Sequence, residues 1–80
     1  MGLDFVELIM RFEEEFDILI PDADASELAS QRKVVDYVMS KVPELTREQV
    51  TERVRQIIED ETGVEDFSED DHFFYDLNID

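Results

Sequence analysis

Three segments of this 80-residue chain place apolar side chains at every third or fourth position, which is the spacing of one face of an α-helix. The segments begin near residues 3, 31 and 47 and end near residues 17, 41 and 62. No stretch alternates apolar and polar residues as a strand does. The chain is therefore predicted to be all-α, a small bundle of three main helices. The apolar stripes consist of Phe5, Leu8, Phe12 and Phe16, then Val34, Val35, Val38 and Met39, and then Val50, Val54, Ile57 and Ile58.

Short polar signals mark the ends of these helices. Ser30 is suited to cap the second helix, and Thr46 with Gln49 has the spacing of a capping box before the third. Gly63 follows the third helix, where a left-handed C-cap residue is expected. Pro21 to Asp24 is predicted to be a loop, because proline interrupts a continuing helix.

The last part of the chain, residues 64–80, breaks the helical pattern. Acidic residues there surround isolated aromatic side chains, and we expect a loop with one short helix near His72 to Asp76. The links between segments are too short to separate two domains, so a single domain spans residues 1–80. The aromatic residues of this part are Phe67, Phe73, Phe74 and Tyr75.

Acidic residues outnumber basic ones by 23 to 7, which gives a net charge of −16. With 42% hydrophobic residues the chain still has enough apolar material for a core, so a folded domain is favoured over a disordered acidic tail. This charge disfavours nucleic acid and anionic lipid as ligands and favours a basic protein surface. Cysteine is absent, which excludes disulfides and cysteine-bound zinc. No apolar run approaches the about 20 residues of a membrane span, and we predict a cytoplasmic protein.

The first segment carries more apolar residues than one stripe needs. Leu3, Val6 and Met10 form a second line along the helix, and acidic side chains flank it. Two interpretations stay open: the helix is buried on a broad arc, or this line is an exposed strip that docks on a basic partner. In the second interpretation the carboxylates speed the encounter and the apolar strip contributes affinity. The flanking acidic residues are Glu7, Glu13 and Glu14.

Several stretches together resemble an acyl carrier protein, with its two halves in reverse order. Leu3 to Asp17, Ile20 to Asp22 and Val35 to Val38 look like the second half of that family, and Glu52 to Ile58, Gly63-Val64 and Phe73 to Asp80 are similar to its first half. Residues 1–41 therefore correspond to the second half and residues 46–80 to the first, with 42–45 as the joining link. The resemblance implies an acyl-carrier-like fold with circularly permuted connectivity, opened at the family's attachment site.

In that family a serine carries a 4′-phosphopantetheine arm and directly follows an Asp-Leu-Gly-x-Asp stretch. Here Asp76 to Asp80 is the similar stretch, and the serine position corresponds to Gly2. Glycine has no hydroxyl and cannot form the phosphodiester, so no cofactor is expected on this chain. The resemblance also implies that Met1 and Asp80 lie side by side, joined by a contact that salt weakens. None of Ser26, Ser30, Ser40 and Ser68 has the family's Asp-Ser-Leu neighbourhood.

By the same resemblance the chain is related to carriers of acyl thioesters in fatty acid or polyketide biosynthesis. Its partners would be basic patches on acyl-chain synthases, acyltransferases or phosphopantetheinyl transferase. A non-catalytic acidic interaction module and an engineered permuted folding scaffold stay open as alternatives, as a monomer or as a domain-swapped dimer. The contact residues that the resemblance implies are Asp80, Leu3, Asp4, Val6, Glu7, Met10, Glu13 and Glu14.

An enzyme is not expected. His72 is the only histidine, and no nucleophile or second base stands near it in the sequence. Asp22 to Ser26 opens like a calcium loop, but Glu27 and Lys33 stand where glycine and glutamate are needed. The acidic residues between 65 and 71 have the ligand chemistry for a divalent cation, yet a solvated acidic loop explains them as well. No firm metal site is therefore predicted.

Overall fold

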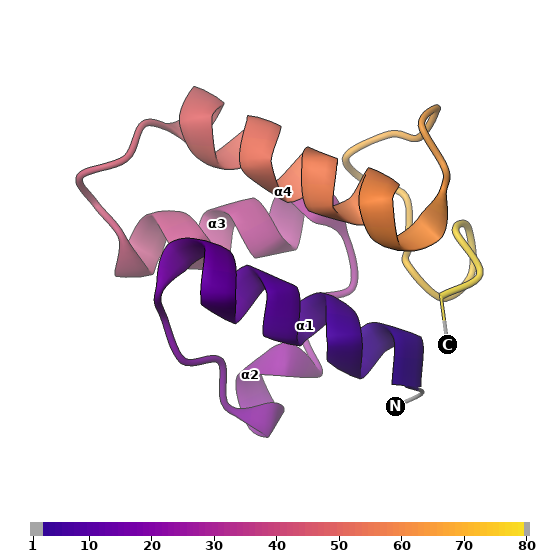
Figure 1. The fold of residues 1–80 in the computed structure, drawn as a ribbon, viewed down its shortest axis with the longest axis horizontal. Coiled ribbons are helices and arrows are strands. Elements are labelled where there is room, and N and C mark those ends of the chain that lie inside the picture. Colours follow the sequence, from indigo (N-terminus) through magenta and orange to yellow (C-terminus); the bar gives the residue numbers. More distant parts are fainter. Residues whose placement is uncertain (1–2, 80) are drawn as a thin grey trace.

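Each long helix forms where an apolar stripe predicts one. The computed structural model describes residues 3–79, and for Leu3 the backbone alone. Its helices are α1 (Leu3–Phe16), α2 (Asp22–Ala25), α3 (Gln31–Lys41) and α4 (Arg47–Thr62), shown in Figure 1. The all-α prediction is confirmed, since residues 3–79 contain four helices and no strand. The expectations for Met1, Gly2, Asp80 and the Leu3 side chain lie outside the described residues.

Helix α4 packs against both α1 and α3 and lies along one side of the other two (Figure 1). Helices α1 and α4 run antiparallel, because Glu15 near the end of α1 pairs with Arg53, whereas Arg11 pairs with Glu61 further along α4. The three stripes meet in one core, and burial of a large apolar side chain there contributes about 1.5–3 kcal/mol. The largest fully buried side chains are Phe5, Phe12, Phe73, Leu8, Ile58, Val34, Val35, Val38, Val50 and Val54.

The predicted helix ends are confirmed. The Ser30 side chain accepts a hydrogen bond from the backbone N–H of Lys33 at the start of α3. Thr46 and Gln49 form both hydrogen bonds of a capping box at the start of α4. Gly63 ends α4 with φ 73°, a left-handed conformation that glycine adopts without a steric penalty.

The loop predicted over Pro21 to Asp24 is wrong in part, because Asp22–Ala25 form one turn of helix, α2. Pro21 stands directly before this turn with φ −58°, and its carbonyl accepts a hydrogen bond from the Ala25 N–H at 2.8 Å. Proline is well tolerated at a helix start, where its missing N–H is not needed. Helix α1 has already ended at Phe16, before Asp17 with φ 53°, so Pro21 begins the next helical turn without having ended the first helix.

The short helix predicted near His72 to Asp76 is absent. The N–H groups of Asp76 and Leu77 both donate to the His72 carbonyl, at 2.8 and 3.2 Å, so this stretch forms turns. Asn78 follows with φ 57°, and a left-handed residue cannot continue a right-handed helix. The short helix of the fold is therefore α2. Asparagine adopts this left-handed conformation more readily than most other residues.

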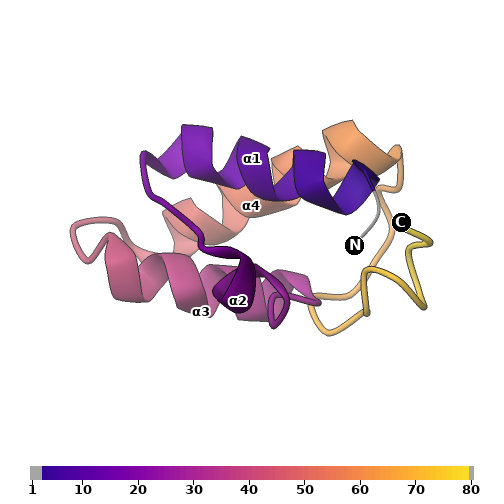
Figure 2. The same ribbon diagram turned by 90° about the horizontal axis from the view of Figure 1, so that it is seen from below.

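Arg55 on α4 holds the segment that follows this helix. Its Nη2 donates to the carbonyl oxygens of Glu65 and Phe67 at 3.0 and 2.9 Å, and its guanidinium lies 4.0 Å from the centre of the Phe67 ring. Its Nη1 donates to the buried Gln31 at 3.1 Å. One arginine thus connects α4, α3 and the irregular segment. Figure 2 shows this segment, in orange to yellow, at the end of the bundle where α1 begins.

The link between α3 and α4 is a tight turn. The N–H of Leu45 donates to the Val42 carbonyl at 3.2 Å, and both side chains pack against the core. The two halves of the chain pack on each other within one copy. Exchange of halves between two copies stays a prediction. Within the described residues no helix has the length and hydropathy needed to cross a membrane.

Candidate docking surface

Helix α1 presents two chemically different faces. Phe5, Leu8 and Phe12 are buried between the other helices, which turns the opposite side of α1 to solvent. Glu7, Met10 and Glu14 are three and four residues apart, so they form one line along that outward side. All three are exposed. The inward face builds the core, and the outward face is available to a partner.

The second apolar line of α1 is exposed where the structure describes it. The exposed fraction is 38% for Val6 and 51% for Met10. This favours the exposed-strip interpretation for these two residues. The broad-arc interpretation holds for Ile9, which is buried. Val6 and Met10 thus form an exposed strip and Ile9 is buried on the same helix, while docking of the strip on a partner stays a prediction.

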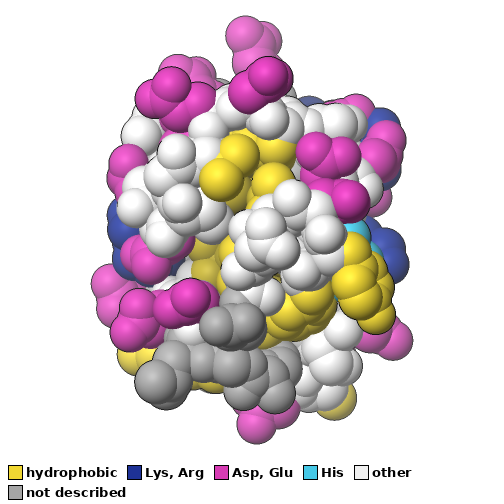
Figure 3. Space-filling view, turned by 90° about the vertical axis from the view of Figure 1, so that its right-hand side faces the viewer, with side chains coloured by type: hydrophobic (Ala, Val, Ile, Leu, Met, Phe, Trp, Pro, Cys, Tyr) yellow, Lys and Arg dark blue, Asp and Glu magenta, His cyan; other side chains and the backbone are white. Residues whose placement is uncertain are grey.

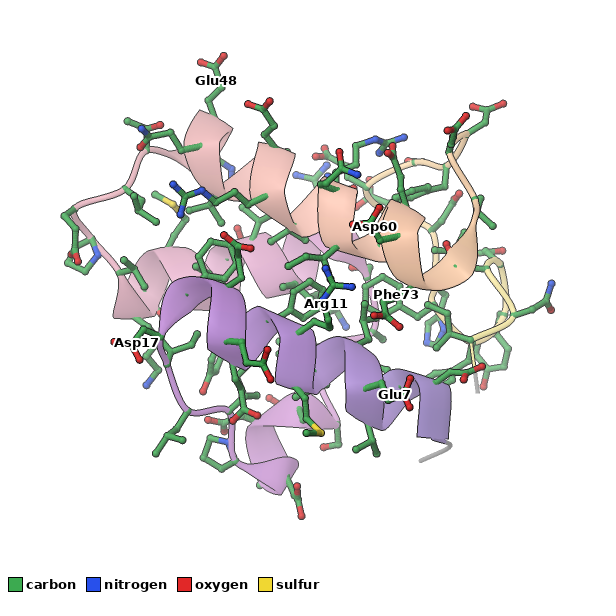
Figure 4. The ribbon with its side chains drawn as sticks, in the orientation of Figure 1. Glu7, Arg11, Asp17, Glu48, Asp60 and Phe73 are labelled. Atoms are coloured by element: carbon green, nitrogen blue, oxygen red, sulfur yellow. The ribbon has the colours of Figure 1, made fainter. Side chains whose placement is uncertain are left out.

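A shallow groove lies between α1 and the end of α4. Its volume is about 200 Å³, and it is lined by Glu7, Met10, Arg11, Glu14 and Glu61. Arg11 crosses from α1 to α4, where Nη1 donates to Glu61 Oε1 at 2.7 Å. Figure 4 shows Arg11 directed toward α4 near Asp60, with Glu7 on the outer side of α1. The hydrogen bond to Glu61 raises the pKa of Arg11 above its usual value, so this groove keeps one positive charge among its carboxylates.

Glu13 has a second task within the fold. Its Oε2 accepts a hydrogen bond from the Ile20 N–H at 2.9 Å, and the residue is only partly exposed. The carboxylate therefore holds the loop after α1. A contact between Glu13 and a partner stays a prediction, and it would compete with this internal bond.

Asp4 lies at a different place from the other acidic contact candidates. It lines a cavity of about 120 Å³, together with Leu8 of α1, the end of α4 and residues 77–79. The start of α1 and the end of the described chain therefore lie side by side, as Figures 1 and 2 also show. Figure 3 looks onto this end of the molecule, where hydrophobic surface is framed by acidic side chains. The cavity is lined by Asp4, Leu8, Glu61, Thr62, Leu77, Asn78 and Ile79.

The serine hydroxyls within residues 3–79 take part in local hydrogen bonds. Those of Ser26 and Ser40 donate to the carbonyl oxygens of Ala23 and Tyr37. Those of Ser30 and Ser68 accept from the backbone N–H groups two or three residues further on. Each serine thus stabilises a turn or a helix end, as its sequence context predicts.

His72 has a structural role. Its Nδ1 accepts hydrogen bonds from the N–H groups of Phe74 and Tyr75 at 3.1 and 3.4 Å, so that nitrogen is already engaged. The backbone N–H of His72 donates to Asp76 Oδ2 at 2.7 Å. Within the part of the chain that the structure describes, no group of three or more acidic or histidine residues is arranged to hold a metal ion. The prediction that the chain is not an enzyme stays a prediction.

The contacts of two arginines could not be predicted from the sequence. Arg11 and Arg55 join segments that are far apart in the chain, Arg11 to Glu61 and Arg55 to Phe67. Each arginine of the chain forms an ion pair with a carboxylate, and Arg32 lies against Glu69 and Asp70. The available signal was their scarcity, because a few basic residues among many acidic ones are rarely left without a partner.

Comparison with known proteins supports an acyl carrier relationship. Acyl carrier proteins of Chlorobium phaeobacteroides and of Buchnera aphidicola subsp. Schizaphis graminum are 49% and 56% identical to the chain over 40 residues. Each match takes in 50% of this chain and 51% of the relative, so the chain spans about half the length of the curated relatives it matches. No family model and no solved structure matches it. The chain is thus related to acyl carrier proteins over half of its length, and it folds as an acyl-carrier-like helical domain.

Proposed function

We propose that this chain is an acyl-carrier-type docking domain with the family's two halves in reverse order. It engages basic surfaces of synthases and acyltransferases, and it does so without a phosphopantetheine arm. The observation that carries the proposal is the outward face of α1, where the apolar side chains of Val6 and Met10 are exposed beside the carboxylates of Glu7 and Glu14.

The reverse order of the halves is supported by where their ends meet. Asp4 and Leu8 of α1 line one cavity with Leu77, Asn78 and Ile79. By resemblance, the family's stretch similar to Asp76–Asp80 runs directly into the stretch similar to Leu3. Because the two segments already lie together, reconnecting them in the family's order requires little movement of the fold.

The chemistry of the α1 face suits a reversible partner. With a net charge of −16 the domain attracts basic surfaces over long range, and this speeds association. Exposed apolar groups such as Met10 then contribute short-range affinity, because the thioether side chain adapts to differently shaped partners. A carrier that visits several enzymes in turn needs this combination of fast encounter and modest affinity.

The residues present do not fit the family's cofactor. Gly2, at the position that matches the modified serine, offers no hydroxyl. The serines within residues 3–79 use their hydroxyls in local hydrogen bonds. The domain therefore retains the docking face and lacks the anchor for a cargo.

Transfer of the arm is the direct test. The purified chain is incubated with coenzyme A and a promiscuous phosphopantetheinyl transferase, and its intact mass is measured. We expect the mass of the original chain to stay unchanged and that of Gly2→Ser to rise by one phosphopantetheine arm, with Gly2→Ala as the matched control. A gain of mass by the original chain would overturn the assignment of Gly2. A folded Gly2→Ser chain that is never modified would overturn the proposed position of the attachment site.

A further inference from the structure

A basic residue stands in the middle of the acidic face of α1. Arg11 follows Glu7 by four residues and precedes Glu14 by three, so it could pair with either along the helix. Its guanidinium instead reaches across to α4, at 2.7 Å from Glu61 and 3.7 Å from Asp60. Glu7 and Glu14 are thereby left facing solvent on α1, and the two carboxylates at the end of α4 share the single positive charge of Arg11.

We propose that Arg11 is a specificity-determining residue of the docking surface, because it occupies Glu61 and Asp60 and confines the cations of a partner to the carboxylates of α1. The inference rests on the proposed docking function and adds to it which acidic groups a partner contacts. The occupant is a basic amphipathic segment of a partner protein. Its arginine or lysine stems lie on Met10 and their charged ends reach Glu7 and Glu14.

The composition of the groove supports this assignment. Its lining combines the exposed apolar side chain of Met10 with the carboxylates of Glu7, Glu14 and Glu61, and this suits a long basic side chain with an apolar stem and a charged end. A partner cation aimed at Glu61 meets the charge of Arg11 and is repelled. Such a repulsive element selects the geometry of a partner more sharply than attraction alone.

A purely structural role makes a different prediction. If Arg11 only held α1 to α4, its removal would lower the stability of the fold and leave binding at Glu7 and Glu14 unchanged. The distinguishing observable is therefore affinity for a basic probe, measured on variants that remain folded. A suitable probe is a synthetic helical peptide composed of leucine and arginine.

The chain offers a matched control in Arg53. This residue also joins α4 to α1, through Glu15 at 3.8 Å, and it does not line the groove. Arg11→Gln and Arg53→Gln therefore change the net charge equally. At low salt we expect Arg11→Gln to bind the peptide about two- to fivefold more tightly than Arg53→Gln does, the range of exposed ion pairs. The difference should vanish near 1 M salt, where the screening length falls to about 3 Å.

A second substitution, at Glu61, tests whether the tighter peptide binding comes from a carboxylate of α4. Glu61→Gln should reverse the tightening in the Arg11→Gln background, because it removes the carboxylate that Arg11 engages in the original chain. Equal affinities of Arg11→Gln and Arg53→Gln would overturn the inference, as would a tightening that Glu61→Gln leaves in place.

Failure of the inference is separable from failure of the proposed function. The double variant Glu7→Gln with Glu14→Gln should weaken peptide binding if α1 is the docking face. If that variant binds as the original chain does, the docking function itself is wrong. If it weakens binding while the two arginine variants agree, only the role of Arg11 is wrong. Circular dichroism of each variant verifies that the helices are intact.

Discussion

The long helices and the segment that follows them both bury aromatic side chains, but by different means. In α1, Phe5 and Phe12 are buried because both lie on one stripe of a regular helix. In residues 64–79, Phe67 and Phe73 are also buried, at 8% and 0% exposed, although their own backbone is irregular. The helices fix their side chains by periodicity, whereas the segment depends on a few contacts with distant residues.

These contacts are identifiable. The N–H of Phe73 donates to the Ala29 carbonyl at 2.8 Å, and the N–H of Arg32 donates to the Glu69 carbonyl at 2.9 Å. The guanidinium of Arg55 holds the stretch before them. A segment without regular secondary structure can therefore belong to the core, as a helix does. We therefore expect removal of one of these contacts to destabilise the whole segment.

Removal of Phe73 should have the largest effect. The side chain is 0% exposed and lies 6.3 Å from Phe5, between ring centres, so Phe73→Ala leaves a cavity in the core. We expect a loss of about 3–5 kcal/mol in the free energy of unfolding. Tyr75→Ala is the control two residues away, because Tyr75 is 83% exposed and should change stability by less than about 0.5 kcal/mol. Urea unfolding of both variants measures the difference.

If Phe73→Ala costs no more than Tyr75→Ala, the segment is not part of the core and the comparison fails. Phe12→Ala in α1 provides the reference for a helical position, since Phe12 is also 0% exposed. Similar losses for Phe73 and Phe12 would show that burial in the segment contributes as much stability as burial in a helix.

Arg55→Gln should cause the next largest loss of stability. The substitution removes the donors to two backbone carbonyls and leaves Gln31, which is buried, without that partner. Loss of such a set costs about 1–3 kcal/mol, because the partly buried acceptors on Gln31 and Phe67 lose their donor. Arg47→Gln is the matched control, because Arg47 makes one exposed ion pair with Asp36. In chemical denaturation we expect a lower unfolding midpoint for Arg55→Gln than for Arg47→Gln. Equal midpoints would contradict the role assigned to Arg55.

The helices could be predicted from the sequence because their determinants are local. The capping box of Thr46 and Gln49 and the C-cap at Gly63 each involve residues within one turn of the helix end. A single helical turn is different, since Asp22–Ala25 form one where a loop was predicted, and the short helix predicted near His72 to Asp76 does not form. Such turns depend on distant packing, which propensity does not encode.

The docking surface also combines features that local sequence patterns reveal with features that depend on tertiary contacts. The second apolar line of α1 was visible in the sequence, but whether it is buried or exposed stayed open, and the structure shows that Val6 and Met10 are exposed. The pairing of Arg11 with Glu61 was missed because the two residues are 50 positions apart. The bond between Glu13 and Ile20 was missed for another reason, since it depends on how the loop after α1 folds back. Local patterns thus located the face, and tertiary contacts determine which of its charges are free.

Three of the described residues have a positive φ: Asp17 with φ 53° directly after α1, and Gly63 and Asn78, which allow a test of how well each region tolerates a left-handed backbone. Gly63 has φ 73° and Asn78 has φ 57°. Gly63→Ala should lower stability by about 1 kcal/mol, because a Cβ is disfavoured at this φ even though the space around it is open. Asn78→Gly should be neutral or stabilising by up to about 0.5 kcal/mol, since asparagine tolerates this conformation better than other residues. A melting temperature that rises for Gly63→Ala or falls for Asn78→Gly would contradict this assignment.

The smallest effect is expected at the edge of the segment, where Arg32 meets Asp70. Arg32 Nε donates to Asp70 Oδ1 at 2.6 Å, and this hydrogen bond lowers the pKa of Asp70 below its usual value. A carboxylate with a lowered pKa in the folded state stabilises the fold above the unfolded pKa of about 4, and this contribution disappears as the pH falls through the lower folded value. Asp70→Asn should therefore reduce the melting temperature at pH 7 slightly more than Asp66→Asn, which removes an exposed charge from the same segment.

The difference between these two variants should shrink as the pH falls below about 4, because protonation then removes the same charge from the original chain. It should also shrink in high salt, since both partners of the pair face solvent. A difference that persists unchanged at low pH would mean that packing of the Asp70 side chain, and not its charge, holds this edge. In that case the edge of the segment would resemble the helices, where shape and burial determine stability.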